Sequence, residues 1–270
     1  MTFILEKMIM QLCATCGTAY AEVSPQRCKI CEDERQWVPA AGQQWTDFAA
    51  LTRSHQNKWQ QLEPGLLSIK TVPNFAIGQR ALLLRSGGGG NILWDCIANL
   101  DPATAELIHA IGGLAAIAIS HPHYYTTMQA WAEEFNAPIY LHADDRQWVM
   151  RDSDAIHFWH GETLPLNSEI DIVRLGGHFA GGSVLHWKAN GGVMLAGDII
   201  QVTPGRDAVS FMWSYPNMLP LSAATVSEML RRCDALAFSR LYGAFEGQDV
   251  AQQAKEIVMQ SGARYLRCLA

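Results

Sequence analysis

Two histidines on either side of a proline are the first residues of the sequence that could bind a metal ion. His121 and His123 lie in "ISHPHYYTTMQAW", directly after the apolar run "LAAIAI". In an extended segment, side chains two positions apart project to the same face, so both imidazoles can contact one ion at about 2.0–2.1 Å. Pro122 favours this extended backbone because its ring disfavours a helix there. The pair alone is weak support for a metal site, since paired histidines also occur as hydrogen-bonded polar residues.

Two later residues strengthen the case for a metal. His178 lies between glycines in "LGGHFAGGSVLHW", where the backbone can approach an ion closely. Asp198 ends the apolar strand "VMLAGDII", where burial of an unpaired carboxylate would be costly. A metal bound at these residues would remove that cost for the carboxylate and for the histidines.

Four cysteines near the N-terminus have the spacing of a second, different metal site. They lie in "CATCGTAYAEVSPQRCKIC" with the pattern C-x2-C-x11-C-x2-C, as Cys13, Cys16, Cys28 and Cys31. Two such turns complete a tetrahedral set of four thiolates at about 2.3 Å from zinc, and Gly17 suits the tight turn. A redox C-x-x-C site would need only one pair and a βαβ context, which is absent. The segment therefore looks like a zinc ribbon with one structural zinc.

Composition and charge limit the class of protein. The chain has 270 residues, 49% of them apolar and 17% charged, so it can bury a large core. The net charge of −6 argues against a nucleic-acid partner, and no apolar stretch reaches the roughly 20 residues that span a bilayer. The start, broken by Glu6 and Lys7, is not expected to be a signal peptide. We therefore expect reduced cysteines, a cytoplasmic location and a small-molecule substrate, with homo-oligomer formation left open.

Apolar periodicity and turn residues predict the elements that carry these side chains. Strands come first, including a hairpin with glycines 87–90 in its turn, and strands alternate with helices afterwards. A helix is predicted from residue 101 with Asp101 as its N-cap, and another over 127–135 after the His-Pro-His segment. Further helices are expected over 223–236 and 249–261. This order predicts a layered α/β fold with two sheets inside and helices outside.

With these residues in place, the sequence resembles the metallo-β-lactamase superfamily. H-x-H, G-G-H-x-x-G-G and L-x-G-D occur in the family's order over about residues 62–270. The resemblance implies a four-layer αββα sandwich over a domain of residues 46–270, after a zinc-ribbon-like segment and linker of residues 1–45. It also implies that His121, His123 and His178 form the first metal site, and that Asp198 occupies the position that usually bridges two metals.

The sequence departs from this family where the second metal would bind. The family pattern H-x-H-x-D-H has Tyr125 here in place of the aspartate and Thr126 in place of the last histidine. The Gly-His that often follows near the C-terminus is replaced by "YGAFEG". These departures predict one metal. Tyr125 could donate a hydrogen bond to a substrate oxyanion, or it could merely fill the space of a lost ligand.

The predicted function is hydrolysis with a single catalytic metal, most simply zinc, with iron or manganese as alternatives. The metal would activate water against an ester, thioester or lactone, with Asp198 and Tyr125 as catalytic residues. His142 and Glu246 are cleft candidates that could rebuild a second metal site, and the aromatic stretch "SFMWSYPNMLPL" is a candidate cleft-lining loop. An iron-dependent oxygenase or sulfur-oxidising enzyme, and a binding protein with a vestigial site, remain alternatives.

Overall fold

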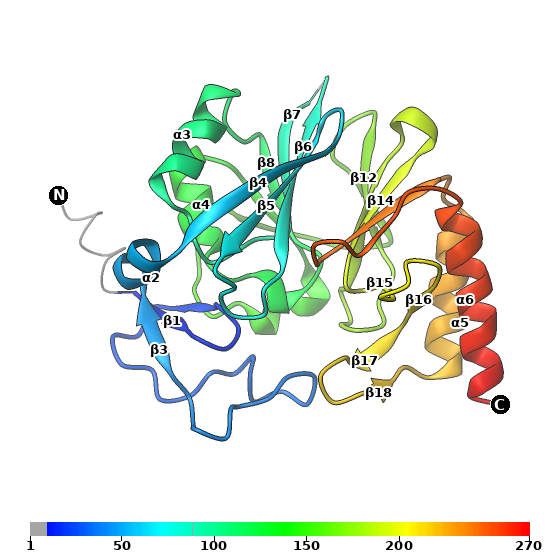
Figure 1. The fold of residues 1–270 in the computed structure, drawn as a ribbon, viewed down its shortest axis with the longest axis horizontal. Coiled ribbons are helices and arrows are strands. Elements are labelled where there is room, and N and C mark those ends of the chain that lie inside the picture. The colour runs from blue at the N-terminus through cyan, green and yellow to red at the C-terminus, as the bar shows by residue number, and fades with distance from the viewer. Residues whose placement is uncertain (1–9, 88) are drawn as a thin grey trace. The chain divides into compact units, whose positions relative to one another are not determined.

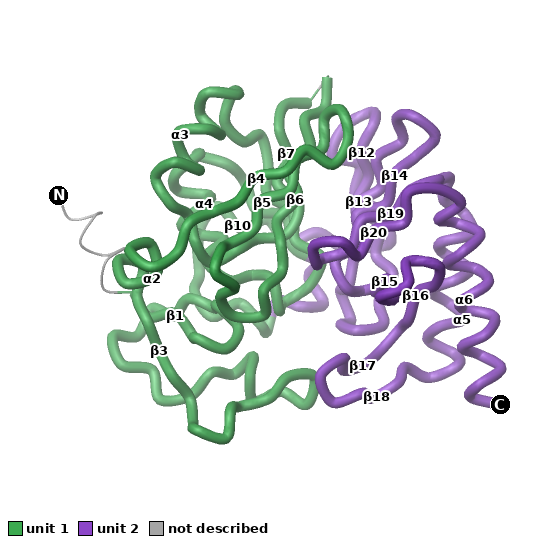
Figure 2. The backbone as a smooth tube through the Cα atoms, in the orientation of Figure 1, with its two compact units in different colours: residues 1–141, 147–157 green, residues 142–146, 158–270 purple. Residues whose placement is uncertain are grey.

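The chain is organised in two compact units. The computed structural model describes residues 10–87 and 89–270. Unit 1 comprises residues 1–141 and 147–157, and unit 2 comprises residues 142–146 and 158–270 (Figure 2). The first nine residues, on which the signal-peptide argument rests, and Gly88 of the predicted hairpin turn lie outside the described residues. Within the described part, no helix is long and apolar enough to cross a bilayer.

The main sheet of unit 1 has seven strands in the order β10-β9-β8-β7-β6-β5-β4. Neighbours from β4 to β7 are antiparallel, so the glycine-rich turn closes a hairpin as predicted, whereas β7, β8 and β9 are parallel. Parallel neighbours need crossover connections, and helices α3 (Pro102–Ala110) and α4 (Met128–Phe135) supply them (Figure 1). The strands are β4 (Gln56–Glu63), β5 (Leu66–Val72), β6 (Arg80–Ser86), β7 (Gly90–Trp94), β8 (Ala116–Ala118), β9 (Ile139–His142) and β10 (Ile156–Trp159).

The cysteine-rich segment forms a small sheet in unit 1, in the order β2-β1-β3, from β1 (Gln11–Cys13), β2 (Ala19–Tyr20) and β3 (Trp45–Asp47). The polar stretch between the last cysteine and the main sheet is partly structured, because helix α2 (Phe48–Ser54) lies there and the polar edge strand β4 begins at Gln56. Leu12 of β1 packs in one buried cluster with Leu51 of α2 and Ala98. The ribbon therefore shares a core with the rest of unit 1, and the 45/46 domain boundary stays a prediction.

Unit 2 holds a six-stranded sheet in the order β11-β12-β13-β14-β19-β20, with helices α5 (Ala223–Asp234) and α6 (Ala254–Cys268) side by side (Figure 1). The predicted start of the last helix at Asp249 is wrong, because Asp249–Val250 pair as β20 with β19 and the helix starts at Ala254. The remaining strands are β11 (Thr163–Pro165), β12 (Ile170–Arg174), β13 (Ser183–Trp187), β14 (Val193–Gly197), β15 (Gln201–Val202), β16 (Val209–Ser210), β17 (Met212–Ser214), β18 (Leu219–Pro220), β19 (Arg240–Gly243) and β20 (Asp249–Val250).

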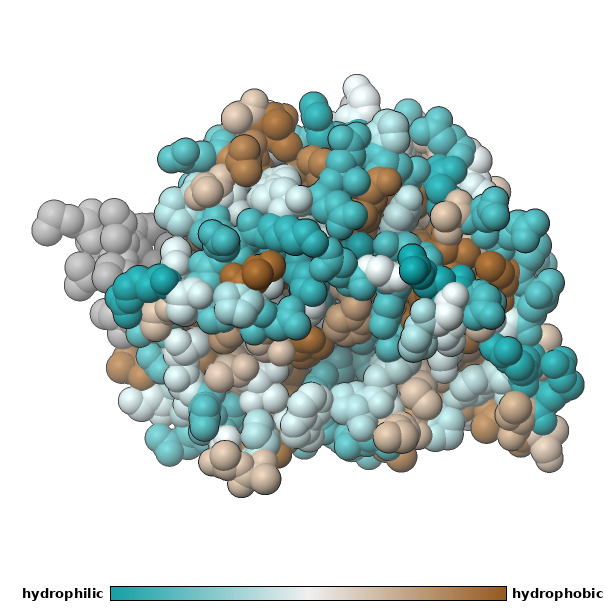
Figure 3. Space-filling view, in the orientation of Figure 1, coloured by the Kyte–Doolittle hydropathy of each residue, from teal (hydrophilic) through white to brown (hydrophobic). Residues whose placement is uncertain are grey.

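Apolar burial explains why the helices lie on their sheets. In unit 2, Met194 and Leu241 of the sheet, Phe211 from the loop region, and Met229 of α5 belong to one buried cluster. Burial of a large apolar side chain contributes about 1.5–3 kcal/mol, so this cluster is a principal source of the unit's stability. The face shown in Figure 3 is mostly hydrophilic, with apolar residues scattered in small groups. Each unit thus combines one main sheet with helices, in agreement with the predicted layered α/β class.

Candidate metal-binding sites

The four cysteines of the ribbon form one compact, buried cluster. Cys13 Sγ lies 3.6 Å from Cys31 Sγ, and Cys16 Sγ lies 3.5 Å from Cys28 Sγ. All four sulfur atoms lie within 4.8 Å of one another. A tetrahedral zinc site with bonds of about 2.3 Å requires sulfur–sulfur distances of about 3.8 Å, whereas a disulfide would require about 2.05 Å. The cluster therefore fits a single zinc ion and not two disulfides.

Hydrogen bonds around the cluster stabilise thiolates. Tyr20 Oη donates to Cys28 Sγ at 3.4 Å, and Gln43 Nε2 donates to Cys13 Sγ at 3.0 Å. The neighbouring thiols, Cys16 first, lower the pKa of Cys13, whereas burial raises the pKa of Cys16. Four buried thiols cannot all ionise together without a cation to offset their charge, so the donor chemistry also fits a bound metal.

The histidine pair is formed by a 3-10 turn and not by an extended segment. His121 is extended, but Pro122–Tyr124 form the 3-10 helix η1. Proline is favourable at the first position of a helical turn, so the argument that Pro122 prevents one is wrong. The turn nevertheless brings the two rings together, with centroids 5.0 Å apart and a nitrogen of each ring within 4.8 Å of the other. Both histidines are buried, and their rings lie side by side in unit 1.

Each ring of the pair has a hydrogen-bonding group at Nδ1. Ser120 Oγ lies 2.9 Å from His121 Nδ1, and Gln36 Nε2 lies 3.4 Å from His123 Nδ1. Metal-ligating imidazoles commonly use their second nitrogen in this way, because the outer hydrogen bond fixes the ring and its tautomer. Two neutral imidazoles that coordinate through Nε2 suit zinc and also iron or manganese.

Asp95 supports this segment and was missed in the sequence analysis. It ends β7, is 1% exposed, and adopts a left-handed backbone with φ of 59°. Its Oδ1 accepts a hydrogen bond from Ser120 N at 2.8 Å, which fixes the backbone beside the histidine pair. The available signal was the same as for Asp198, namely a carboxylate at the end of an apolar strand.

Tyr125 and Thr126, at the positions of the missing second-metal ligands, are both buried. Tyr125 N donates to Pro122 O at 3.2 Å and so closes η1. Thr126 adopts a left-handed φ of 37°, which is unfavourable for a β-branched residue, and its carbonyl accepts a hydrogen bond from Ala19 N of the ribbon at 2.9 Å. A Cβ atom on Gly17 would lie 3.5 Å from the Thr126 methyl. Thr126 therefore lies beside the ribbon turn, so the position of the missing histidine is next to Gly17.

His178 belongs to unit 2, in a glycine-rich loop of residues 175–182 between β12 and β13. The ring is 1% exposed, and Nδ1–H donates to Met212 O at 3.1 Å. Because a carbonyl can only accept, Nδ1 carries the ring proton, and Nε2 is the nitrogen with which this ring could ligate a metal. The ring of Tyr215 lies 5.6 Å from that of His178, between centroids.

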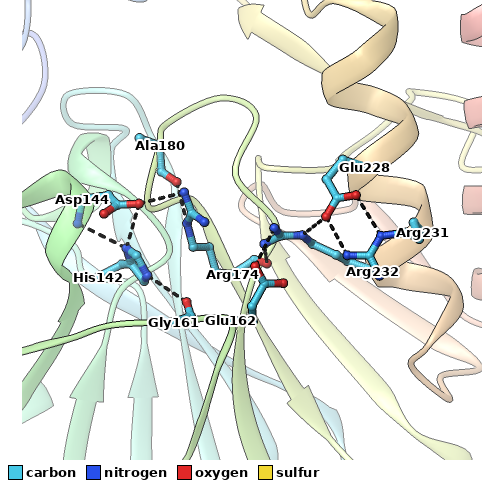
Figure 4. Close-up of polar contacts among 9 residues, drawn as sticks. All are labelled: His142, Asp144, Gly161, Glu162, Arg174, Ala180, Glu228, Arg231 and Arg232. Carbon is cyan, nitrogen blue, oxygen red and sulfur yellow. Dashed lines mark hydrogen bonds and ion pairs between the residues drawn. The ribbon is translucent and has the colours of Figure 1, made fainter.

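The glycine-rich loop is held by charged residues (Figure 4). Arg174 Nε donates to Ala180 O at 2.9 Å, and its Nη2 lies 2.7 Å from Asp144 Oδ2. The buried Asp145 accepts a hydrogen bond from Gly181 N at 3.0 Å. A Cβ atom at Gly181 would lie 2.7 Å from Asp145 Oδ2, so only glycine fits this approach. The loop geometry is thus set from outside the loop.

Asp198 follows β14 in unit 2 and is 6% exposed. Burial, followed by the nearby Asp198 carboxylate, raises the pKa of Tyr215, so its phenol stays protonated at neutral pH. Tyr215 Oη also donates to Ser210 O at 3.2 Å. Tyr215 belongs to the aromatic stretch predicted to line a cleft, although the tyrosine itself was not predicted as a site residue, and it lies near both His178 and Asp198.

The two residues considered as replacement ligands have other environments. His142 Nε2–H donates to Gly161 O at 3.1 Å, and Nδ1 accepts from Asp144 N at 3.2 Å (Figure 4). Both nitrogens of the neutral ring are therefore used, and burial lowers the pKa of His142 and favours this form. Glu246 is exposed in the turn between β19 and β20. Neither position is arranged as a buried ligand within unit 2.

Comparison with known proteins identifies the relatives of the chain. No family model matches the sequence. The chain is 48% identical over 265 residues to the uncharacterized protein YmaE of Bacillus subtilis (strain 168), and the match covers 96% of each protein. The chain belongs to the YmaE family. This relationship extends over the ribbon as well as the rest of the chain, because so little of either protein is left out.

The solved structures that resemble this chain include metallo-β-lactamases. DIM-1 metallo-beta-lactamase gives a TM-score of 0.58 at 12% identity, covering 77% of this chain and 98% of that one. FIM-1 from Pseudomonas aeruginosa, in its mono-zinc form, gives a TM-score of 0.56 at 16% identity, and the match covers 78% of this chain and 96% of FIM-1. The metallo-beta-lactamase from Hirschia baltica gives a TM-score of 0.56 at 15% identity, and the match covers 78% of this chain and 97% of that enzyme. At these identities the likeness concerns the fold, and it confirms the predicted αββα metallo-β-lactamase class.

Proposed function

We propose that the chain is a metal-dependent hydrolase in which His121, His123 and His178 bind one catalytic zinc, with Asp198 beside the attacking water. The observation that carries this proposal is common to the three imidazoles. Each is at most 2% exposed, and each has its Nδ1 beside a hydrogen-bonding group of its own unit, from Ser120, Gln36 and Met212. Three such rings offer Nε2 to one ion, as in catalytic zinc sites with three protein ligands.

The side chains have distinct proposed roles in hydrolysis. Zinc at such a site lowers the pKa of bound water towards about 7 and polarises a substrate carbonyl. Asp198, buried at the end of β14, orients the water and accepts its proton. The buried phenol of Tyr125 is our candidate donor to the oxyanion that develops on the substrate. Replacement of Tyr125 with phenylalanine should then lower turnover about 10-fold, a loss of about 1.4 kcal/mol of transition-state stabilisation.

A single catalytic ion is supported by the residues at the second-metal positions. Thr126 packs against the ribbon, His142 uses both ring nitrogens in backbone hydrogen bonds, and Glu246 is exposed. FIM-1, which has the same fold, is described in a mono-zinc form. We therefore propose two zinc ions per chain in total, one in the ribbon and one at the histidines.

The proposed substrates are small acyl compounds, namely esters, thioesters or lactones. The structural neighbours are named for β-lactams, which are cyclic amides, and the same attack on a carbonyl applies to the proposed substrates. A net charge of −6 disfavours polyanions such as nucleic acids. Reduced, clustered cysteines favour a cytoplasmic location.

Elemental analysis combined with one ligand variant tests the proposal. The wild type should contain two zinc ions per chain and should hydrolyse members of an ester, thioester and lactone panel. Replacement of His178 with alanine should remove one metal and lower turnover at least 100-fold, because one of three nitrogen ligands is lost. His186→Ala is the matched control, since this buried histidine donates from Nε2–H to Ala237 O and is not a proposed ligand. It should retain both metals.

Two results would contradict the hydrolase proposal. One is turnover at the wild-type rate by protein from which a chelator has removed the second metal. The other is iron at the histidine site together with oxygen uptake on thiol substrates, which would assign the chain to the oxygenase alternative.

A further inference from the structure

The ribbon segment reaches the candidate catalytic centre through Gln36. This residue follows the last cysteine of the cluster, Cys31, and its amide nitrogen lies 3.4 Å from His123 Nδ1. Both side chains are buried, with 6% of Gln36 and 2% of His123 exposed. The cysteine cluster, Gln36 and His123 all belong to unit 1. A direct path therefore runs from the cluster to a proposed catalytic ligand.

The turn that carries Gln36 is held in place by ribbon residues. Gln36 N donates to Asp33 O at 2.9 Å, and Arg35 Nη2 donates to Asp33 Oδ2 at 2.9 Å. The Arg35 guanidinium also lies over the ring of Trp148, 5.2 Å from its centroid. The turn begins directly after the second cysteine knuckle, in which Glu32 N donates to Cys28 O at 3.0 Å. The turn is thus continuous with the knuckle that carries Cys28 and Cys31.

A glutamine amide can fix the tautomer that a metal ligand needs. For His123 to coordinate through Nε2, its Nδ1 must carry the proton and donate it to an acceptor. The carboxamide has an acceptor end, and a rotation about its terminal bond exchanges oxygen with nitrogen at the same position. Gln36 can therefore accept from Nδ1–H when a metal occupies the other ring nitrogen.

We propose that Gln36 is a positioning residue for His123, and that the ribbon zinc, by holding the Gln36 turn, sets the metal affinity of the histidine centre. The inference rests on the metal site of the proposed function. It adds to the predicted structural role of the ribbon an effect on the catalytic metal, which the cysteine spacing alone does not indicate.

Zinc affinity measured by competition with a chromogenic chelator tests this inference. Gln36→Ala should raise the dissociation constant of the histidine-site zinc about 10-fold or more, the usual effect of losing such a partner. Gln36→Glu should restore the affinity to wild type or better, because a carboxylate also accepts from Nδ1–H. Gln26→Ala is the matched control, since Gln26 is an exposed ribbon glutamine whose Nε2 donates to Ser24 O at 3.3 Å. Elemental analysis should show one retained ribbon zinc in all three variants.

The outcomes separate this inference from the proposed function. Unchanged affinity in Gln36→Ala, or equal losses in the alanine and glutamate variants, would overturn the positioning role. A folded Cys28→Ser protein should also bind zinc more weakly at the histidines, and wild-type affinity in it would overturn the link to the ribbon. A wild type that binds zinc only in the ribbon would overturn the proposed function together with this inference.

Discussion

The cysteine cluster and the histidine centre are built in different ways. Cys13 and Cys31 are 18 positions apart, and two short turns between them bring all four thiols together. The proposed histidine ligands come from η1 in unit 1 and from the glycine-rich loop in unit 2. Four thiolates complete the coordination sphere of one ion, whereas three proposed imidazole ligands would leave a position for substrate, and each ring has its own hydrogen-bonding group. A local motif can therefore be identified from spacing, but an open centre depends on long-range packing.

The largest effect is expected from breaking the closed cluster. Cys28→Ser should release the ribbon zinc and lower the unfolding midpoint by on the order of 10 °C, because metal binding contributes directly to folding. Cys233→Ser is the matched control, since this buried thiol has no role in the cluster and burial raises its pKa to about 12. Thermal unfolding with zinc analysis checks both variants. Equal midpoints for wild type and folded Cys28→Ser would contradict a structural zinc.

Restoring the family pattern at the open centre should give the next largest effect. The double variant Tyr125→Asp and Thr126→His adds a carboxylate near the proposed site and an imidazole against Gly17 of the ribbon, where there is little space. We expect one metal at the centre, lower stability and at least 10-fold lower turnover, because the added negative charge has no second ion to offset it. Metal counts and turnover provide the measurement. Two tightly bound ions with faster turnover would contradict the one-metal proposal.

Neighbouring aspartates allow a test of the support of the glycine-rich loop. Asp145→Ala removes the acceptor of Gly181 N and should weaken zinc binding at the histidine centre about 10-fold. Asp144→Ala removes a half-exposed partner of Arg174 and should change stability by less than about 1 kcal/mol. Zinc competition and denaturant unfolding distinguish the two. Equal zinc affinity in both variants would show that the loop does not need its buried anchor.

The smallest expected effect is a pH dependence from His142. Burial lowers its pKa below the ordinary value of 6.5, so the folded protein takes up fewer protons than the unfolded chain as the pH falls. Neutral His142 therefore contributes fully to stability above about pH 6.5, the pKa of the unfolded chain. This contribution is lost as the pH falls through the lower pKa of His142 in the folded protein. The free energy of unfolding of wild type and His142→Gln can be measured by denaturant at pH values from about 7.5 to about 5, on either side of the ordinary pKa of about 6.5. It should fall less steeply with decreasing pH in the variant. An equal pH dependence of the unfolding free energy in both proteins would show that groups other than His142 cause it.

Local signals predicted much of the fold. Asp101 caps α3 as expected, with Oδ1 accepting from Thr104 N at 2.7 Å, and the glycine-rich hairpin joins β6 to β7. The cysteine spacing likewise corresponds to one cluster. Each of these features is determined by residues close together in the chain. The start of α6 was missed because the pairing of Leu241 with Val250, a longer-range contact, extends the sheet to Val250.

The supporting residues of the candidate site could not be predicted in the same way. Gln36 and Tyr215 contact or approach histidines far away in sequence, and neither belongs to a spaced motif. The two rings of the His-Pro-His segment come together as expected although the backbone was predicted wrongly, since a 3-10 turn and an extended strand can both bring two rings together. Residue type therefore indicated the candidate ligands, while the residues that contact them required the tertiary structure.

The buried cluster of Leu12, Leu51 and Ala98 limits how far the protein can be shortened. A version trimmed to begin at residue 46 would lose Leu12 and leave its two apolar neighbours exposed to water. It would also lose the amide of Gln36 beside His123. Such a minimal version should aggregate and bind metal poorly at the histidine site, so any shortened form of this scaffold has to retain the ribbon.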